Sequence, residues 1–113
     1  MNNTDVIAAL AQTIQDRKEN PQEGSYTCYL FEKGIDKILK KVGEECSETI
    51  IAAKNVEKCG NDELCLEIAD LTYHLLVMMN CCGLDIEKVA AELEKRAEKS
   101  GNLKTFKTVD KNS

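Results

Sequence analysis

The stretch DELCLEIADLTYHLLVMMNCCG, residues 62–83, decides the fold because it predicts one long helix in the middle of the core. Its apolar residues first recur every three or four positions, and after Leu71 the segment is apolar on nearly all sides. A helix of this kind is buried over most of its surface. Asn61 is a candidate cap at its start, and Gly83 is the residue type that commonly ends a helix.

Three further helical segments precede this stretch. Residues 3–18 have apolar positions at helical spacing, and residues 19–25, which contain the only proline, are typical of a loop. A short helix is expected next, with Ser25 or Thr27 as its cap. From residue 35 to around residues 58–61, apolar positions again recur every three or four residues, which predicts a long amphipathic helix.

The rest of the chain completes an all-helical pattern. Asp85 is a candidate cap for a last helix that extends to residue 100, and the tail over residues 101–113 has no sustained period and is expected to be disordered. Clusters of β-branched and aromatic residues, which favour strands, are few. A chain of 113 residues has the length of one domain. The sequence therefore predicts one all-α helical bundle, of about four to five helices, over residues 1–100.

The predicted bundle is expected to be completed by a second copy of the chain. About 95 ordered residues that include one helix apolar on most sides expose more apolar surface than a monomer of this size can cover. Two copies that pack their long helices together would cover that surface. We therefore expect a homodimer.

Composition excludes several classes of partner. The net charge of −5 predicts repulsion from nucleic acid, so no nucleic-acid partner is expected. The longest apolar run, residues 75–79, is far shorter than the about 20 residues needed to cross a bilayer. The N-terminal segment lacks the basic start and apolar run of a secretory signal. These features predict a cytoplasmic protein without a membrane partner.

The six cysteines are predicted to be reduced and structural. An even number of cysteines indicates a disulfide framework in exported proteins, and the sequence shows no export signal. No CxxC pair is present and there is a single histidine, so a zinc site is not expected. Cys46, Cys65 and Cys82 lie on or near apolar helical faces, where cysteine packs as a small hydrophobe.

Acidic residues give the strongest functional signal. Glu45 and Glu48, with Glu44 beside them, lie at the margin of the apolar stripe of one helix, and Glu67 and Asp70 hold the same position on the next helix. Either pair alone is typical of solvated helix acids. Carboxylates gathered at the edge of a core are costly unless a cation neutralises them. A shared metal site and solvated acids are therefore the two alternatives.

The residue types favour magnesium, manganese or calcium if a metal is bound, because these ions prefer oxygen ligands. Magnesium usually shares phosphate oxygens with a substrate, so it would let an acidic protein bind a polyanion. A cluster of lysines would assist, beside the alternative that part of it is a solvated helix face: Lys33, Lys37, Lys40 and Lys41. His74, four residues after Asp70, is a candidate to bind substrate or orient a carboxylate, beside the alternative of a partly buried structural histidine.

Several motifs resemble those of the phosphoribosyl-ATP pyrophosphatase family, an enzyme family of histidine biosynthesis within the all-α, MazG-like nucleoside-triphosphate pyrophosphohydrolases. They are SYT at 25–27, KKVGEE at 40–45 with Glu48, and EIADLTYHLLVMM at 67–79. The two acid pairs alone indicate only the superfamily, and the other motifs narrow the resemblance to this family. The resemblance extends from about Thr4 to Ser100.

The resemblance implies Mg²⁺-dependent hydrolysis of the α–β phosphoanhydride of a nucleotide, 1-(5-phosphoribosyl)-ATP, by a homodimer. The products would be phosphoribosyl-AMP and pyrophosphate, in the second step of L-histidine biosynthesis. The implied metal-binding acids are Glu45, Glu48, Glu67 and Asp70. Glu44 is implied as a further ligand or as the base that orients water, which makes the candidate catalytic residues Glu44, Glu45 and Glu48. The candidate phosphate contacts are Arg17, Lys18, Lys37, Lys40 and Lys41, with His74 added from its position beside Asp70.

Two other functions stay open at this point. A pyrophosphatase for damaged or non-standard nucleoside triphosphates would use the same acids on a different substrate. A helical interaction module would carry solvated acids and catalyse nothing. Comparing activity on phosphoribosyl-ATP with activity on dUTP and dCTP distinguishes the first alternative. The second predicts that Mg²⁺ with nucleotide does not stabilise the protein against thermal unfolding.

Overall fold

The computed structural model describes residues 3–100 of the chain, so the expected tail at 101–113 lies outside the described residues. Every regular element in the described part is a helix, which confirms the all-α prediction there. The helices are α1 (Asn3–Glu19), α2 (Tyr26–Lys33), α3 (Ile35–Lys54), α4 (Val56–Cys59), α5 (Asp62–Cys81) and α6 (Ile86–Ser100).

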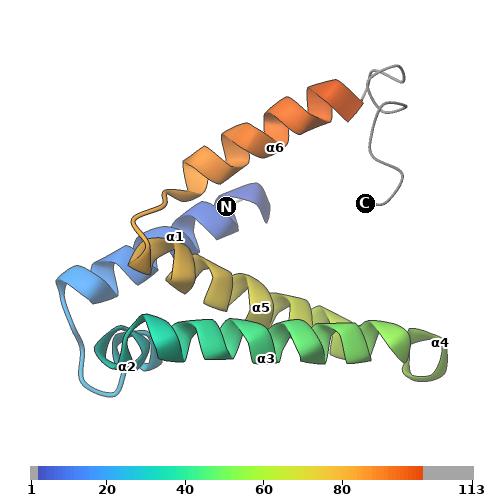
Figure 1. Ribbon diagram of the computed structural model, residues 1–113, viewed down its shortest axis with the longest axis horizontal. Coiled ribbons are helices and arrows are strands. Elements are labelled where there is room, and N and C mark those ends of the chain that lie inside the picture. The colour runs from blue at the N-terminus through green and yellow to red at the C-terminus, as the bar shows by residue number, and fades with distance from the viewer. Residues whose placement is uncertain (1–2, 101–113) are drawn as a thin grey trace.

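The helices α3 and α5, of 20 residues each, lie side by side as an antiparallel hairpin that α4 closes at one end (Figure 1). The sequence predicted one continuous helix from residue 35 to around residues 58–61. In the structure α3 ends at Lys54, because Asn55 leaves the helical conformation, with φ −97° and ψ 7°. Asparagine side chains compete for backbone groups and disfavour helix interiors. Gly60, with φ 78°, then turns the chain toward α5. The described part therefore contains six helices, where four to five were predicted.

The core lies where α1 and α2 meet the hairpin at the end opposite α4 (Figure 1). Side chains from four helices are buried there: Ile14, Leu30, Ile38, Leu76 and Val77. Each contributes about 1.5–3 kcal/mol of hydrophobic stabilisation when fully buried. The core therefore fixes the register of α3 against α5, and this register sets which side chains face each other farther along the hairpin.

Two of the predicted helix caps are confirmed. The backbone N–H of Cys28 donates to Oγ of Ser25 at 3.2 Å, and the N–H of Glu87 donates to Oδ1 of Asp85 at 2.9 Å. Each bond satisfies an amide that the first turn of a helix leaves without a partner. Asn61 is the N-cap residue of α5, as predicted, but its side chain makes no capping hydrogen bond with any described residue.

All six cysteines are among the described residues and all are free thiols, as predicted. Cys46, Cys65 and Cys82 are nevertheless exposed. The prediction that they pack is wrong for a single chain, because each of the three is exposed there.

The apolar helix α5 is long and hydrophobic enough, by length and composition, to cross a membrane. It packs along α3 and against α1 and α2, however, and supplies Leu76 and Val77 to the core. It also carries the acids Glu67 and Asp70 in its first half. These features identify α5 as the central helix of a helical bundle and do not indicate a membrane span.

Gly83 ends α5 in a conformation that other residues rarely adopt, with φ 72°. Its N–H donates to the carbonyl of Asn80 at 3.1 Å, and the N–H of Leu84 donates to the carbonyl of Met79 at 2.8 Å, which is a Schellman closure. We expect Gly83→Ala to lower the free energy of unfolding by about 1 kcal/mol, because an alanine Cβ disfavours positive φ. Equilibrium urea unfolding measures this change.

Gly43 provides the matched control for that substitution. It lies inside α3, and a Cβ added there meets nothing within 4 Å. Gly43→Ala is expected to raise the free energy of unfolding by up to about 1 kcal/mol, because alanine is the better helix former. A Gly83→Ala variant that is as stable as wild type or more stable would contradict the role assigned to Gly83.

Candidate active site

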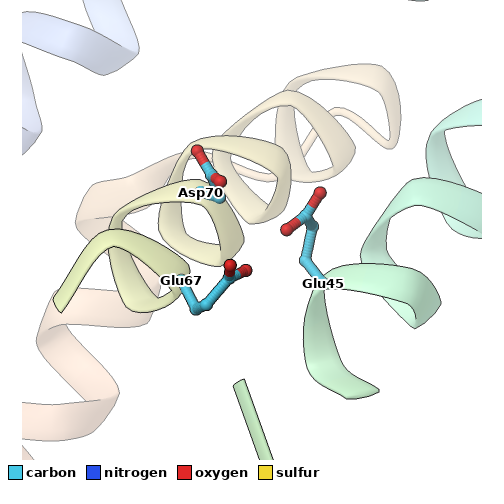
Figure 2. Close-up of side chains that lie close together, drawn as sticks. All are labelled: Glu45, Glu67 and Asp70. Carbon is cyan, nitrogen blue, oxygen red and sulfur yellow. The ribbon is translucent and has the colours of Figure 1, made fainter. Parts of the chain in front are cut away.

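The hairpin brings the predicted acids together. Glu45 on α3 faces Glu67 and Asp70 on α5, and one carboxylate oxygen of each lies within 4.8 Å of the others (Figure 2). The spacing of three residues places Glu67 and Asp70 on the same face of α5. Thr49 joins the two helices at this level, since its hydroxyl donates to the Glu45 carbonyl at 2.7 Å and lies 3.4 Å from the Glu67 carbonyl. The two acidic edges therefore share one site.

Burial of these carboxylates costs free energy unless a positive group neutralises them. Glu45 is buried, with 6% of its surface exposed, and Glu67 is half-buried. The Oε2 atoms of both residues are shielded from solvent, and neither has a hydrogen-bond partner among the described residues. A buried charged acceptor without a donor costs free energy. The two oxygens are thus available to a cation.

The electrostatics of the acids reflect this crowding. Burial raises the pKa of Glu45, and the nearby carboxylates of Glu48 and Asp70 raise it further. Burial also raises the pKa of Glu67, with Glu48 beside it as the next cause. Like charges held together in this way disfavour ionisation. Such shifts are typical of sites that bind a cation or exchange protons.

The fourth implied metal ligand, Glu48, lies next to the cluster. It is exposed on α3, one turn after Glu45, and it lines an open cavity with Glu67 and Glu63 toward α4. It is not one of the three acids whose oxygens converge within 4.8 Å, so its role as a metal ligand stays a prediction.

Lys41 is the predicted phosphate contact that lies at the acids. Its Nζ is 3.7 Å from Oε2 of Glu44 and 3.8 Å from Oε1 of Glu45. The Glu44 side chain is 44% exposed, whereas that of Glu45 is 7% exposed. One ammonium group therefore stands at the mouth of the cluster, and Glu44 lies on its outer side.

Comparison with known proteins identifies the family. Residues 7–97 match the family model described as phosphoribosyl-ATP pyrophosphohydrolase. The chain belongs to this family. The phosphoribosyl-ATP pyrophosphatase of Clostridium botulinum (strain Kyoto / Type A2) is 55% identical over 112 residues, which cover 98% of this chain and 99% of the relative. That of Listeria welshimeri is 54% identical over 101 residues, which cover 89% and 94%.

The chain is also similar to about half of a larger protein. The histidine biosynthesis bifunctional protein HisIE of Lactococcus lactis is 50% identical over 105 residues, which cover 93% of this chain and 48% of the relative. The match to the family model confirms the recognition made from the sequence motifs. As a family member, the chain is a hydrolase of histidine biosynthesis.

Other basic residues predicted to bind phosphate lie in different surroundings. Arg17 pairs with its neighbour Asp16 at 3.0 Å, and the Lys18 ammonium lies 5.6 Å from the centre of the Phe31 ring. Within the described part of the chain, no ion pair is formed by Lys37 or Lys40. The contacts of these four residues with substrate stay predictions.

His74 is buried, with 5% of its surface exposed, and both ring nitrogens have partners. Nδ1 lies 2.8 Å from the carbonyl oxygen of Asp70, and Nε2 lies 3.0 Å from the hydroxyl of Tyr26. Its predicted contact with substrate stays a prediction. Sequence reasoning assigned no role to Tyr26, although it belongs to the SYT motif, because nothing local connects it to a residue 48 positions away.

Proposed function

We propose that the chain hydrolyses the α–β phosphoanhydride of 1-(5-phosphoribosyl)-ATP to 1-(5-phosphoribosyl)-AMP and pyrophosphate, the second step of histidine biosynthesis, with Mg²⁺. The supporting observation is the convergence of Glu45, Glu67 and Asp70 within 4.8 Å, with two shielded oxygens that lack partners among the described residues. This cluster occurs in a chain 55% identical to a phosphoribosyl-ATP pyrophosphatase.

The donor set fits Mg²⁺, which prefers carboxylate oxygens and usually shares phosphate oxygens with its substrate. Glu45, Glu67 and Asp70 would hold the ion, and Glu48, next to Glu67, would supply a fourth ligand. When bound, Mg²⁺ neutralises phosphate charge and makes coordinated water a better nucleophile. The unpartnered oxygens of Glu45 and Glu67 would then gain the positive partner that they lack.

The chain's own residues would accept the proton and bind the phosphates. The oxygen of a water molecule bonds to phosphorus, the anhydride P–O bond breaks, and the bridging oxygen leaves with one of the two products. The proton lost by the water passes to a carboxylate, for which the exposed Glu44 and Glu48 are the candidates. Lys41, beside the cluster, would bind phosphate oxygens. No side-chain nucleophile is needed.

One assay tests this function and its rivals. Pyrophosphate release is measured from phosphoribosyl-ATP, dUTP and dCTP, each with Mg²⁺ and with EDTA. We expect Mg²⁺-dependent release from phosphoribosyl-ATP that is much faster than from the other two. Faster release from dUTP or dCTP would support a pyrophosphatase for non-standard nucleotides. Absence of release and of any thermal stabilisation by Mg²⁺ with nucleotide would support an interaction module.

We also propose that the enzyme is a homodimer. Ile50 and Ile51 on α3 are 68% and 60% exposed, and Leu66 and Ile68 on α5 are 66% and 48% exposed. In the most apolar window of α5, 17% of the residues are buried within one chain. Large apolar surfaces on a single chain are typical of an interface. A second copy packed on the hairpin would cover these residues.

Leu66→Glu is expected to convert the dimer to a monomer at micromolar concentration, because a desolvated carboxylate would be placed in the interface. Light scattering coupled to size-exclusion chromatography should report a mass that falls from two chains to one. Lys95→Glu on α6, at an exposed polar site on a helix away from the hairpin, is the control and should leave the mass unchanged (Figure 1). A wild-type chain that elutes as a monomer would contradict the dimer.

A further inference from the structure

Tyr26, at the start of α2, is connected to the acid cluster through His74. Its hydroxyl lies 3.0 Å from Nε2 of His74, and Nδ1 of the same ring lies 2.8 Å from the carbonyl oxygen of Asp70. His74 is 5% exposed, whereas Tyr26 is 45% exposed. Two hydrogen bonds therefore extend from the backbone of a site acid, through a buried ring, to a phenol at the surface.

The direction of these hydrogen bonds follows from the Asp70 carbonyl, which can only accept. Nδ1 of His74 must therefore donate to it. In the neutral ring, Nε2 then carries only a lone pair, so the Tyr26 hydroxyl donates its proton to Nε2. The Tyr26 oxygen keeps free lone pairs and has no proton left to donate. It is a fixed hydrogen-bond acceptor.

This acceptor lies among the charged groups of the site. The pKa of Lys41 is raised: burial lowers it, but Tyr26, Glu44 and Glu45 together raise it by more. Burial raises the pKa of Tyr26, and the Lys41 ammonium, which is the next largest cause, lowers it. The position of the phenol at the site follows from its contact with His74, whose ring centroid lies 5.8 Å from that of Tyr26 and whose Nδ1 bonds to the backbone of Asp70.

We propose that Tyr26 is a substrate-binding residue whose hydroxyl oxygen accepts a hydrogen bond from a sugar hydroxyl of the nucleotide, and that His74 is a positioning residue that holds Tyr26 for this contact. The inference rests on the proposed function, since it takes the phosphates to be bound at the acids. Phosphate oxygens offer only lone pairs and do not suit an acceptor. The sugar next to the α-phosphate carries hydroxyl donors, and it would lie beside the cluster that holds the phosphates.

Binding titrations with nucleotides that cannot be cleaved test the contact. The probes are the Mg²⁺ complexes of α,β-methylene-ATP and its 2′-deoxy and 3′-deoxy forms, measured by calorimetry. We expect the wild-type chain to bind the ribose form about fivefold more tightly than one of the deoxy forms. Tyr26→Phe, which removes only the hydroxyl, should bind all three forms with equal affinity.

Tyr29 offers a matched control one turn farther along α2. It is 40% exposed, its ring lies 6.0 Å from that of Tyr26, and its hydroxyl has no hydrogen bond to a described residue. Tyr29→Phe should keep the wild-type preference for ribose. The Tyr26 contact is overturned if Tyr26→Phe keeps that preference, or if the wild-type chain shows no preference among the three forms.

Two variants of His74 test the positioning role. In His74→Gln, the amide oxygen can still accept from the Tyr26 hydroxyl, whereas in His74→Asn the shorter amide can replace only the Nδ1 bond to Asp70. We expect the glutamine variant to keep the preference for ribose and the asparagine variant to lose it. Equal behaviour of two folded variants would overturn the positioning role. If neither variant folds by circular dichroism, the Tyr26 and Tyr29 pair still decides the main proposal.

The outcomes separate this inference from the proposed function. Hydrolysis of phosphoribosyl-ATP by the wild-type chain, together with unaltered ribose preference in Tyr26→Phe, would reject the Tyr26 contact and leave the function standing. Ribose preference that depends on Tyr26, in a chain that does not hydrolyse phosphoribosyl-ATP, would keep the contact and reject the function.

Discussion

Glu45→Gln is expected to lower the rate of pyrophosphate release from phosphoribosyl-ATP by about three orders of magnitude at saturating Mg²⁺. The amide keeps the size of the side chain and removes its charge at the most buried of the three converging acids. Loss of several kcal/mol of transition-state charge stabilisation corresponds to a rate reduction of about that size. Initial rates of pyrophosphate formation measure the change, and circular dichroism reports whether the helices persist.

Two further variants are needed to interpret the rate of the Glu45 variant. Glu48→Gln, one turn farther along α3, should also abolish pyrophosphate release while the chain remains folded. Glu92→Gln, in an exposed ion pair with Arg96 on α6, should retain the wild-type rate. If the Glu45 variant releases pyrophosphate at the wild-type rate, Glu45 does not take part in catalysis, whatever the rates of the other two variants.

The sequence was sufficient to place each acid pair at the margin of an apolar stripe because that property is local. The spacing from Glu67 to Asp70 puts both side chains on one helical face whatever the tertiary structure. Glu45 lies at the margin of an apolar stripe, and pairing of the stripes of α3 and α5 brings the acids together. The caps at Ser25 and Asp85 are equally local, since each contacts an amide two or three residues away.

The features that the sequence did not reveal depend on how separate helices pack. Tyr26 meets His74 only because α2 lies against α5 near the end of the hairpin, and the two residues are 48 positions apart. Arg17 pairs with Asp16, but its long side chain could reach several acidic partners, and the sequence does not specify which one it takes. The exposure of Cys46 depends on whether a helix covers its side of α3, which periodicity cannot specify.

Glu45→Gln is also expected to stabilise the chain when no metal is present. In EDTA at about pH 8, the variant should unfold at a temperature roughly 5 °C above that of wild type. The reason is that Oε2 of Glu45 is shielded without a partner among the described residues, and the pKa of Glu45 is raised by burial and by the neighbouring acids. A penalty of about 1 kcal/mol for a charged acceptor in this situation would disappear with the charge.

Addition of Mg²⁺ is expected to reverse this order. Ligands that bind only the folded state raise its stability in proportion to the logarithm of their concentration relative to Kd. Wild type should therefore gain thermal stability as Mg²⁺ is raised, whereas the Glu45 variant, with a weakened site, should gain less. Glu92→Gln serves as the control and should follow wild type in both media, because its side chain is exposed on α6, which carries none of the three converging acids.

The two media together distinguish three kinds of acid. A solvated acid on a helix surface would leave the melting temperature unchanged with and without Mg²⁺ when it is replaced by glutamine. An acid that stabilises the fold through Lys41, 3.8 Å away, would make the glutamine variant less stable in both media. An acid that is held for a cation destabilises the empty site and stabilises the occupied one, so only this role produces opposite signs. A Glu45 variant that is less stable than wild type in EDTA would therefore assign Glu45 to the fold instead of to a metal.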